Sequence, residues 1–199
     1  MTNIIAHWNM VHKTKNRHWL TESNPEKVYQ LHHVDDLING DKRLNILEIG
    51  AGSGDSPRFL SKKHDVTVVD IVPEAFENLS CKTVLTEDFI REPVDSQDLI
   101  LSHLVIQHCY EDMVKYLISC SLRCLRPGGF FSFQFSYFPG EPSKALEDFF
   151  EKEWLRFYSL EEMTDTVEDY GGVFVNTYGP VVHPEEYNIH WYIMHCMKE

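Results

Sequence analysis

Three glycines at alternate positions, Gly50, Gly52 and Gly54, follow the apolar run at 44–49. Glycine adopts positive φ without steric cost and lets a ligand approach the backbone closely, so a strand that ends in such a turn is typical of a nucleotide-type site. A dinucleotide fingerprint, G-x-G-x-x-G, requires a glycine at position 55, where this chain has an aspartate. The spacing here is G-x-G-x-G, with Glu48 two residues before the first glycine.

An acidic residue, Asp70, stands twenty positions after Gly50, at the end of the strand predicted at 66–69. A carboxylate there can accept hydrogen bonds from both ribose hydroxyls of a nucleoside, at the strand ends where open parallel sheets bind ligands. Asp55 stands where the next helix begins, and an acid in a first helical turn suits the helix dipole. Because a carboxylate repels a pyrophosphate and tolerates a cationic ligand, the pattern argues against a dinucleotide.

The elements that must position these residues alternate along the chain. Predicted strands lie at 44–49, 66–69, 83–85, 99–101, 130–137, 174–178 and 189–196. Predicted helices lie at 25–40, 56–63, 73–79, 111–125 and 159–170. Strands that alternate with helices predict a parallel sheet covered on both faces, and the last two strands, with no helix between them, are expected to pair antiparallel. The expected fold class is α/β: a Rossmann-like three-layer sandwich with a mostly parallel seven-stranded sheet and a C-terminal antiparallel hairpin.

Two helix starts carry capping signals. Pro25 suits a first helical position, with Ser23 or Asn24 as the cap, and Ser159 with Glu162 matches a capping box. The pair Gly171-Gly172 is expected to stop the last helix.

Five motifs occur in one order across about residues 40–137. They are the glycine turn with Glu48, Asp70, Glu87-Asp88-Phe89, Asp98 to Ser102, and Leu125 to Gly129. Together they resemble the motifs of class I S-adenosylmethionine-dependent methyltransferases of the small-molecule type. The resemblance implies that the chain binds S-adenosylmethionine and transfers its methyl group. The length of 199 residues predicts one compact domain, 1–199.

The resemblance also assigns cofactor contacts. The turn would pass beneath the methionine part, Glu48 would orient the turn or reach the amino group through water, and Asp70 would hold the ribose. Ile71 would pack on the adenine, Asp88 would accept from its amine, and Phe89 would use its backbone N–H or its ring. The expected cofactor set is Glu48, Gly50, Ala51, Gly52, Gly54, Asp70, Ile71, Asp88, Phe89 and Ser102.

The loop after the fourth strand, 102–110, faces the methyl group in this family's fold. His103 and His108 are the candidate general bases, because histidine titrates near neutral pH. The alternative for His108 is a structural role near the start of the next helix. An amine or thiol acceptor could react without any base.

Aromatic residues are the candidates for contact with the acceptor. Residues 1–40 are expected to form a leader and helix that close over the cofactor, and 138–158 a substrate lid. The candidate substrate residues are Trp8, Tyr137, Trp154 and Tyr158. The alternative is a lid packed for its own stability, while the phenylalanines of 130–135 are expected in the core.

Charge limits the partners. The 31 acidic residues outnumber the 18 basic ones, for a net charge of −13, so neither nucleic acid nor an anionic membrane surface is an expected partner. Lys13, Lys15 and Arg17 form the one locally basic stretch and leave an anionic small substrate possible. Five cysteines without a C-x-x-C pair and without an export signal predict a reducing, cytoplasmic location.

A metal site is not expected. His183, His190 and His195 lie near the carboxyl end, but positions 190 and 195 differ by an odd number and face opposite sides of a regular strand.

The expected function is methyl transfer to O or N of a small-molecule or glycan-like acceptor, by a monomer or a homodimer. The glycan suggestion depends on a similarity of 104–108 and 133–135 to methyltransferases of sugar modification. A protein-directed methyltransferase and a catalytically silent binding or partner subunit are the alternatives.

Overall fold

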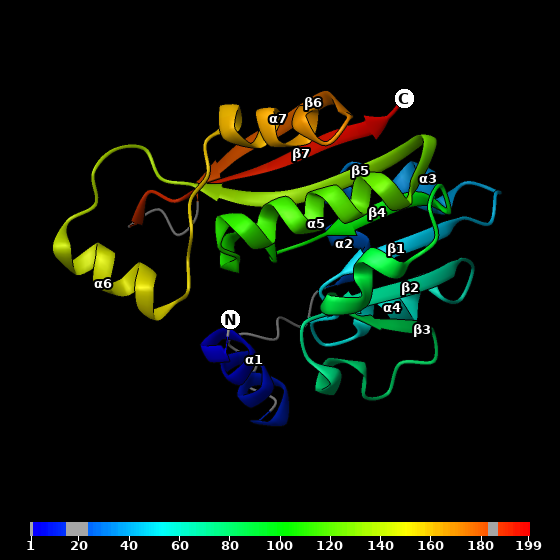
Figure 1. Cartoon of the computed structure of the whole chain (residues 1–199), viewed down its shortest axis with the longest axis horizontal. Coiled ribbons are helices and arrows are strands. Elements are labelled where there is room, and N and C mark those ends of the chain that lie inside the picture. The colour runs from blue at the N-terminus through cyan, green and yellow to red at the C-terminus, as the bar shows by residue number, and fades with distance from the viewer. Residues whose placement is uncertain (1, 15–23, 183–186) are drawn as a thin grey trace.

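A seven-stranded sheet in the order β3-β2-β1-β4-β5-β7-β6 runs through the centre of the computed structural model (Figure 1). The structure describes residues 2–14, 24–182 and 187–199. The strands are β1 (Asn45–Ile49), β2 (Asp65–Asp70), β3 (Lys82–Leu85), β4 (Gln97–Ser102), β5 (Leu125–Tyr137), β6 (Gly172–Val182) and β7 (His190–Lys198). Strands β1 to β5 pair in parallel, and β7 lies antiparallel between β5 and β6. The predicted fold class is confirmed.

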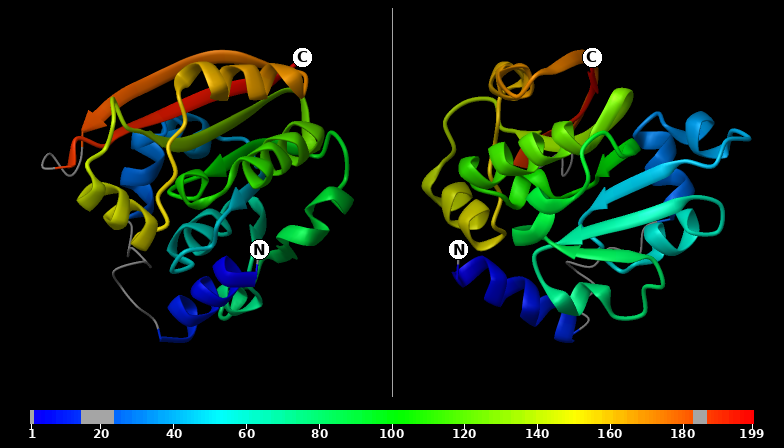
Figure 2. Two further views of the ribbon diagram at one scale, coloured as in Figure 1. Left: turned by 60° about the vertical axis from the view of Figure 1, so that its left-hand side comes forward. Right: turned by 45° about the vertical axis from the view of Figure 1, so that its right-hand side comes forward.

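Helices cover both faces of this sheet (Figure 2). The α-helices are α1 (Thr2–Thr14), α2 (Pro25–Leu31), α3 (Asp35–Asn39), α4 (Asp55–Leu60), α5 (Glu111–Cys124), α6 (Lys144–Lys152) and α7 (Leu160–Asp169). Short 3-10 helices are η1 (Pro73–Phe76), η2 (Thr86–Arg91) and η3 (Ile106–His108). Alternate residues of the buried strands face opposite layers, which is why these strands read as continuous apolar runs.

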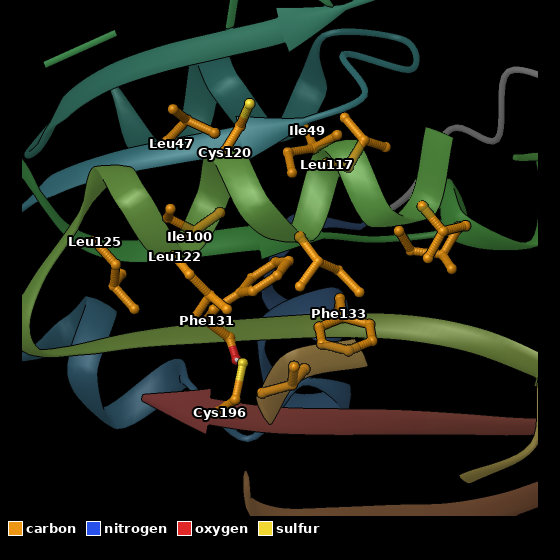
Figure 3. Close-up of a cluster of buried hydrophobic side chains, with 14 of the residues drawn as sticks. Leu47, Ile49, Ile100, Leu117, Cys120, Leu122, Leu125, Phe131, Phe133 and Cys196 are labelled. Atoms are coloured by element: carbon orange, nitrogen blue, oxygen red, sulfur yellow. Dashed lines mark hydrogen bonds between the residues drawn. The ribbon is translucent and has the colours of Figure 1, made fainter. Parts of the chain in front are cut away.

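One face of the sheet packs against α5 and α7. Side chains of β1, β4 and β5, among them Leu47, Ile100 and Phe131, interlock with Leu117 and Leu122 of α5 (Figure 3). The opposite face buries Ile46 and Leu99 against α2, α3 and α4. The phenylalanines at 131, 133 and 135 are fully buried, as predicted. All five cysteines are free thiols, and Cys120 and Cys124 are buried on α5 as apolar residues.

The capping predictions are confirmed. Asn24 Oδ1 accepts from the backbone N–H of Glu26 at 3.1 Å, and Ser159 and Glu162 form both halves of the capping box. Ser23 lies outside the described residues.

The single helix predicted at 25–40 is wrong in its middle. It is two helices, because α2 ends at Leu31 and α3 begins only at Asp35. His33 adopts φ +50°, which no helix interior tolerates. The apolar residues predicted to face the core still do so after the break, since Val34 and Ile38 are buried. The side chain of His32 is fully buried at this break.

Helices α1 and α6 were not predicted as helices, and both lie on the side toward which the parallel strands point (Figure 2). None of the helices in the described ranges is long and apolar enough to cross a membrane.

Candidate active site

A buried carboxylate holds the turn between β1 and α4. Asp70, the last residue of β2, accepts hydrogen bonds from the backbone N–H groups of Ala51 at 2.9 Å and Val72 at 3.2 Å. Burial raises the pKa of Asp70, while these backbone donors and the nearby His12 of α1 lower it. The predicted ribose ligand therefore also positions the glycine turn.

The three glycines of the turn all adopt positive φ: +88° at Gly50, +52° at Gly52 and +80° at Gly54. A Cβ on Gly50 would collide with Cγ2 of Val105, in the loop after β4, whereas a Cβ on Gly52 would meet none of the described residues within 4 Å. Gly50 is thus required by packing, and Gly52 lies beside open space that a ligand could fill.

Two buried polar atoms lie at the ends of neighbouring strands. Oε2 of Glu48 and Oγ of Ser102 have no hydrogen-bond partner among the residues that the structure describes. Burial raises the pKa of Glu48 to about 8, although a hydrogen bond with Ser56 lowers it, so the carboxyl is mostly protonated at pH 7. Unsatisfied buried polar atoms call for a ligand or water. With the open space at Gly52, they fit a polar cofactor at this turn.

The adenine contacts predicted at the ends of β2 and β3 are only partly available. Ile71 is half-buried and packs against the cluster of Ala51 and Leu60. The carboxylate of Asp88 lies 2.7 Å from Arg91, with 43% of its side chain exposed. The ring of Phe89 is fully buried in the opposite core. Phe89 can therefore contact an adenine through its backbone N–H, whereas its ring is not accessible to a ligand.

His108 lies in an aromatic cluster formed by three separate segments. Its ring is 5.4 Å from that of Trp8 on α1, and its Nδ1 is 3.3 Å from the backbone oxygen of Trp154, which follows α6. His7 lies 5.4 Å from Trp8 and 5.6 Å from Trp154, between ring centroids. The structure thus brings together three of the predicted residues from separate segments, although Trp8 and Trp154 are 146 positions apart in the chain.

The hydrogen bond to Trp154 decides which nitrogen of His108 carries hydrogen. A backbone carbonyl only accepts, so Nδ1 is the donor and Nε2 of the neutral ring carries the lone pair. Burial lowers the pKa of His108 to about 4, opposed by the same hydrogen bond. The ring is therefore neutral at pH 7 and able to accept a proton at Nε2.

His103, the other candidate base, is held by a different set of residues. Its Nδ1 lies 3.2 Å from Nε2 of His32, whose Nδ1 lies 2.7 Å from Oγ of Ser132 on β5. Burial lowers the pKa of His103 to about 4. The next residue, Leu104, adopts φ +56°, a strained conformation of the kind that clusters at functional sites.

Two predicted substrate residues have other partners. The hydroxyl of Tyr158 donates to the backbone oxygen of Cys109 at 2.5 Å, and its ring belongs to the core. The ring of Tyr137 contacts His190 and Tyr192 of β7. In the predicted lid, Phe138, Phe150 and Phe157 pack on one another, so this cluster stabilises the segment itself.

Helix α1 lies between both ends of the site. Trp8, in the middle of α1, contacts His108. Near the end of the helix, His12 is close enough to Asp70 to lower its pKa, and Lys13 forms an ion pair with Glu74 at 3.0 Å. Lys13 is therefore engaged with the protein, while Lys15 and Arg17 lie outside the described residues. Nothing in the sequence pattern indicated His7, His32 or Ser132 as members of this site, because their partners are distant in the chain.

No group of three metal-ligating side chains lies together within the ranges 2–14, 24–182 and 187–199. Nε2 of His190 contacts Asn188, and Nε2 of His195 contacts the backbone oxygen of His32. His183 falls in the gap between the described ranges.

A solvent-open hollow lies at the opposite, amino-terminal ends of the strands, lined by Asn45, Lys82 and Gln97 among others. Its charged groups are already paired, Arg43 with Asp65 and Lys82 with Glu92, each at 2.5 Å. It lies away from the glycine turn, and we assign it no role in the chemistry.

Comparisons with known proteins agree with this geometry. Residues 47–133 match the sequence profile of a family described as a methyltransferase domain. No curated protein matches the sequence.

Solved structures share the fold at low identity. A 1,6-didemethyltoxoflavin-N1-methyltransferase from Burkholderia thailandensis, with its substrate and S-adenosylhomocysteine bound, is 16% identical with a TM-score of 0.71, covering 98% of this chain and 87% of its own. A phosphoethanolamine N-methyltransferase 2 from Haemonchus contortus, in complex with S-adenosyl-L-methionine, is 15% identical with a TM-score of 0.68. The match includes 85% of this chain but only 52% of the length of that enzyme. The [4+2]-cyclase SpnF is 13% identical with a TM-score of 0.63, covering 84% of this chain and 80% of its own.

The matched segment runs from within β1 to within β5 and includes the glycine turn, and the sheet is that of a Rossmann-like methyltransferase fold. Residues 47–133 thus match a methyltransferase domain, and the shared fold supports a class I S-adenosylmethionine-dependent methyltransferase, as the motifs indicated, with S-adenosylmethionine as the cofactor.

The contact of Gly50 with Val105 predicts the effect of adding one methyl group. Gly50→Ala and Gly52→Ala both place alanine at positive φ, at a cost of about 1–2 kcal/mol each. Only Gly50→Ala also collides with the stiff side chain of Val105, so it should lower the free energy of unfolding by about 1–3 kcal/mol more. Urea denaturation measures both. In a Val105→Ala background the two alanine variants should become alike, and an undiminished difference would contradict the packing explanation.

The raised pKa of Glu48 predicts a pH dependence. The folded state keeps a proton to about pH 8, whereas the unfolded chain releases it near the ordinary value of 4.5. The stabilising contribution of the protonated carboxyl is therefore complete below pH 4.5 and is lost as the pH rises to about 8. Relative to wild type, Glu48→Gln should gain more than about 1 kcal/mol in unfolding free energy between pH 5 and pH 8. Glu26→Gln, at an exposed position, is the control. Parallel pH profiles of wild type and Glu48→Gln would show that Glu48 ionises normally.

Proposed function

We propose that this chain transfers the methyl group of S-adenosylmethionine to an oxygen or nitrogen atom of a small-molecule acceptor. The observation that carries the proposal is the position of His108, neutral and with its lone pair on Nε2, inside an aromatic cluster of Trp8 and Trp154. The loop that carries His108 also covers the glycine turn through the contact of Val105 with Gly50. The cofactor turn and the candidate base are therefore directly connected.

The glycine turn is the proposed cofactor subsite. Asp70 would accept from the ribose hydroxyls while it holds Ala51, and Glu48, protonated at neutral pH, would offer a hydrogen to the methionine part. When bound, the cofactor supplies a methyl group on a positively charged sulfur, and the carbon–sulfur bond breaks as the bond to the acceptor forms. Arg58, the cation beside Gly54, is paired with Asp55 at 2.6 Å, and this pairing suits the positive charge of the sulfur.

His108 is the proposed proton acceptor. As the methyl group arrives, an O–H or N–H acceptor must lose one proton, and Nε2 of His108 can take it. Its other nitrogen stays bound to the carbonyl of Trp154, which keeps the ring in one orientation. This arrangement supplies orientation and a base, the two contributions that methyl transfer requires from a protein.

Two segments near His108 and the substrates of similar structures favour a small acceptor. Trp8 of α1 and Trp154 of the segment 138–158 both contact His108. We propose that α1 and this segment act as leader and lid within one domain spanning 1–199. Neighbours of this fold act on phosphoethanolamine and on a didemethyltoxoflavin, which favours a small acceptor. A glycan-like acceptor stays within the proposal, and the five free thiols suit a reducing, cytoplasmic location.

A second candidate function is a protein of this fold without methyl transfer. The cyclase SpnF shares the fold with this chain, so the fold alone does not determine the reaction. His108 distinguishes the two candidate functions. A methyltransferase of this kind needs His108 oriented as a base, whereas a protein that transfers no methyl group does not.

The experiment follows a labelled methyl group. The protein is incubated with methyl-labelled S-adenosylmethionine and separate pools of amines, planar N-heterocycles, phenols and oligosaccharides, with a protein extract as the macromolecular pool. We expect label in one small-molecule pool. His108→Gln should lower the turnover by about 10²–10⁴-fold for an acceptor that must lose a proton, with unchanged binding of the cofactor by calorimetry.

Lys27→Gln, at an exposed position of α2, is the control. Label only in the protein pool would overturn the small-molecule proposal. Cofactor binding without transfer to any pool would favour the non-methylating alternative, and full turnover of His108→Gln would remove His108 as the base.

A further inference from the structure

We propose that Ser132 and His32 fix the protonation of His103 so that its ring presents an N–H group, and not a lone pair, to the acceptor. His32 is in this view a positioning residue that acts through His103. The inference deepens the proposed function by dividing the work of the two histidines: His108 receives the proton, and His103 donates a hydrogen bond.

The three side chains form one hydrogen-bonded row from β5, through the residue after α2, to the loop after β4. Oγ of Ser132 on β5 lies 2.7 Å from Nδ1 of His32, and Nε2 of His32 lies 3.2 Å from Nδ1 of His103. The two imidazole rings meet edge to face, with centroids 5.3 Å apart and planes at 71°. Each contact is within hydrogen-bonding distance, so each must have a donor and an acceptor.

The direction of the row follows from the serine. Ser132 is fully buried, and a buried hydroxyl that keeps its hydrogen unbonded is costly. Within the described part of the chain, the acceptor that its hydroxyl reaches is Nδ1 of His32. The serine therefore donates to Nδ1, and the neutral ring of His32 carries its hydrogen on Nε2.

The hydrogen bond between His32 and His103 runs in the same donor-to-acceptor direction. The N–H at Nε2 of His32 donates to Nδ1 of His103, so the hydrogen of His103 is on Nε2. Both rings are neutral at pH 7, because burial lowers the pKa of His103 to about 4 and that of His32 well below its ordinary value. His103 is thus the opposite tautomer of His108, whose hydrogen is on Nδ1.

Residues of β7 and β6 hold the row in place. His195 on β7 donates from Nε2 to the backbone oxygen of His32 at 2.8 Å, and the ring of Tyr178 on β6 packs on His195 at 4.9 Å. Backbone strain marks both ends, with φ +50° at His33 and +56° at Leu104, directly after the two histidines. A ring located this firmly keeps one tautomer, whereas a mobile imidazole samples both.

This arrangement narrows the acceptor chemistry. A donor at Nε2 of His103 suits an acceptor that carries a hydrogen-bond-accepting oxygen or nitrogen besides the atom that is methylated. A hydrocarbon amine without such a group would leave the N–H of His103 unbonded in a desolvated site, which lowers its binding.

The test is a long-range ¹H–¹⁵N correlation spectrum of the ¹⁵N-labelled protein at pH 7, which distinguishes a protonated from a bare ring nitrogen. It needs neither cofactor nor acceptor, so its result is independent of whether methyl transfer is found. We expect His103 to be protonated at Nε2 only. The variants Ser132→Ala and His32→Phe should show both tautomers of His103, whereas His32→Gln, whose side-chain amide can donate in place of Nε2, should restore the single tautomer.

A wild-type His103 protonated at Nδ1 would overturn the proposal. So would a single Nε2 tautomer in wild type that persists in both Ser132→Ala and His32→Phe, since His32 would then have no influence on it. Should His32→Phe fail to fold, as judged by its amide spectrum, Ser132→Ala decides alone, because it removes only one hydroxyl.

Discussion

The carboxylate of Asp70 is the contact on which the rest of the site depends. It accepts from the backbone of Ala51, within the turn, and of Val72, beyond its own strand. Hydrogen bonds to a charged group contribute about 1.5–3 kcal/mol, enough to hold a turn whose three glycines all have positive φ. With the turn in this position, Gly50 approaches Val105 so closely that only a residue without a Cβ fits. The loop that carries both candidate catalytic histidines is therefore located by the same contact that locates the cofactor turn.

The two histidines of that loop are held in different ways and consequently have different chemistry. The carbonyl of Trp154 leaves a lone pair on Nε2 of His108, and the row from Ser132 through His32 places a hydrogen on Nε2 of His103. Burial keeps both rings uncharged at neutral pH. With both rings neutral, the site can bind the molecule to be methylated without placing a second positive charge beside a sulfonium. His108 becomes positive only when it takes the proton, as the sulfur loses its charge with the methyl group.

Much of the fold could be predicted from the sequence because its signals are local. The apolar runs of the seven strands, the capping box at Ser159 and the glycine turn at Gly50 each depend on residues within a few positions of one another. Of the site, the sequence predicted Asp70, His108, Trp8 and Trp154, and the structure places the last three together.

The remaining features depend on contacts between distant residues, which no periodic pattern records. His32 contacts Ser132 across 100 positions and His195 across 163, at the point where the helix predicted at 25–40 is interrupted. Phe89 follows a motif that indicates a ligand contact, yet its ring fills the core, because a 3-10 helix turns it inward. The sequence predicts Tyr158 as a lid residue in contact with the substrate, but its hydroxyl donates to the backbone oxygen of Cys109.

The most direct measurement is a calorimetric titration of S-adenosylmethionine into the wild-type chain and into Asp70→Asn. Asparagine keeps the size of the side chain and one oxygen for the N–H of Ala51, and removes the charge and one acceptor. The account predicts that the wild-type chain binds the cofactor and that the variant, still folded, binds it at least about tenfold more weakly. No binding by the wild-type chain, or equal affinity of the two, would contradict a cofactor site built on Asp70 and the glycine turn.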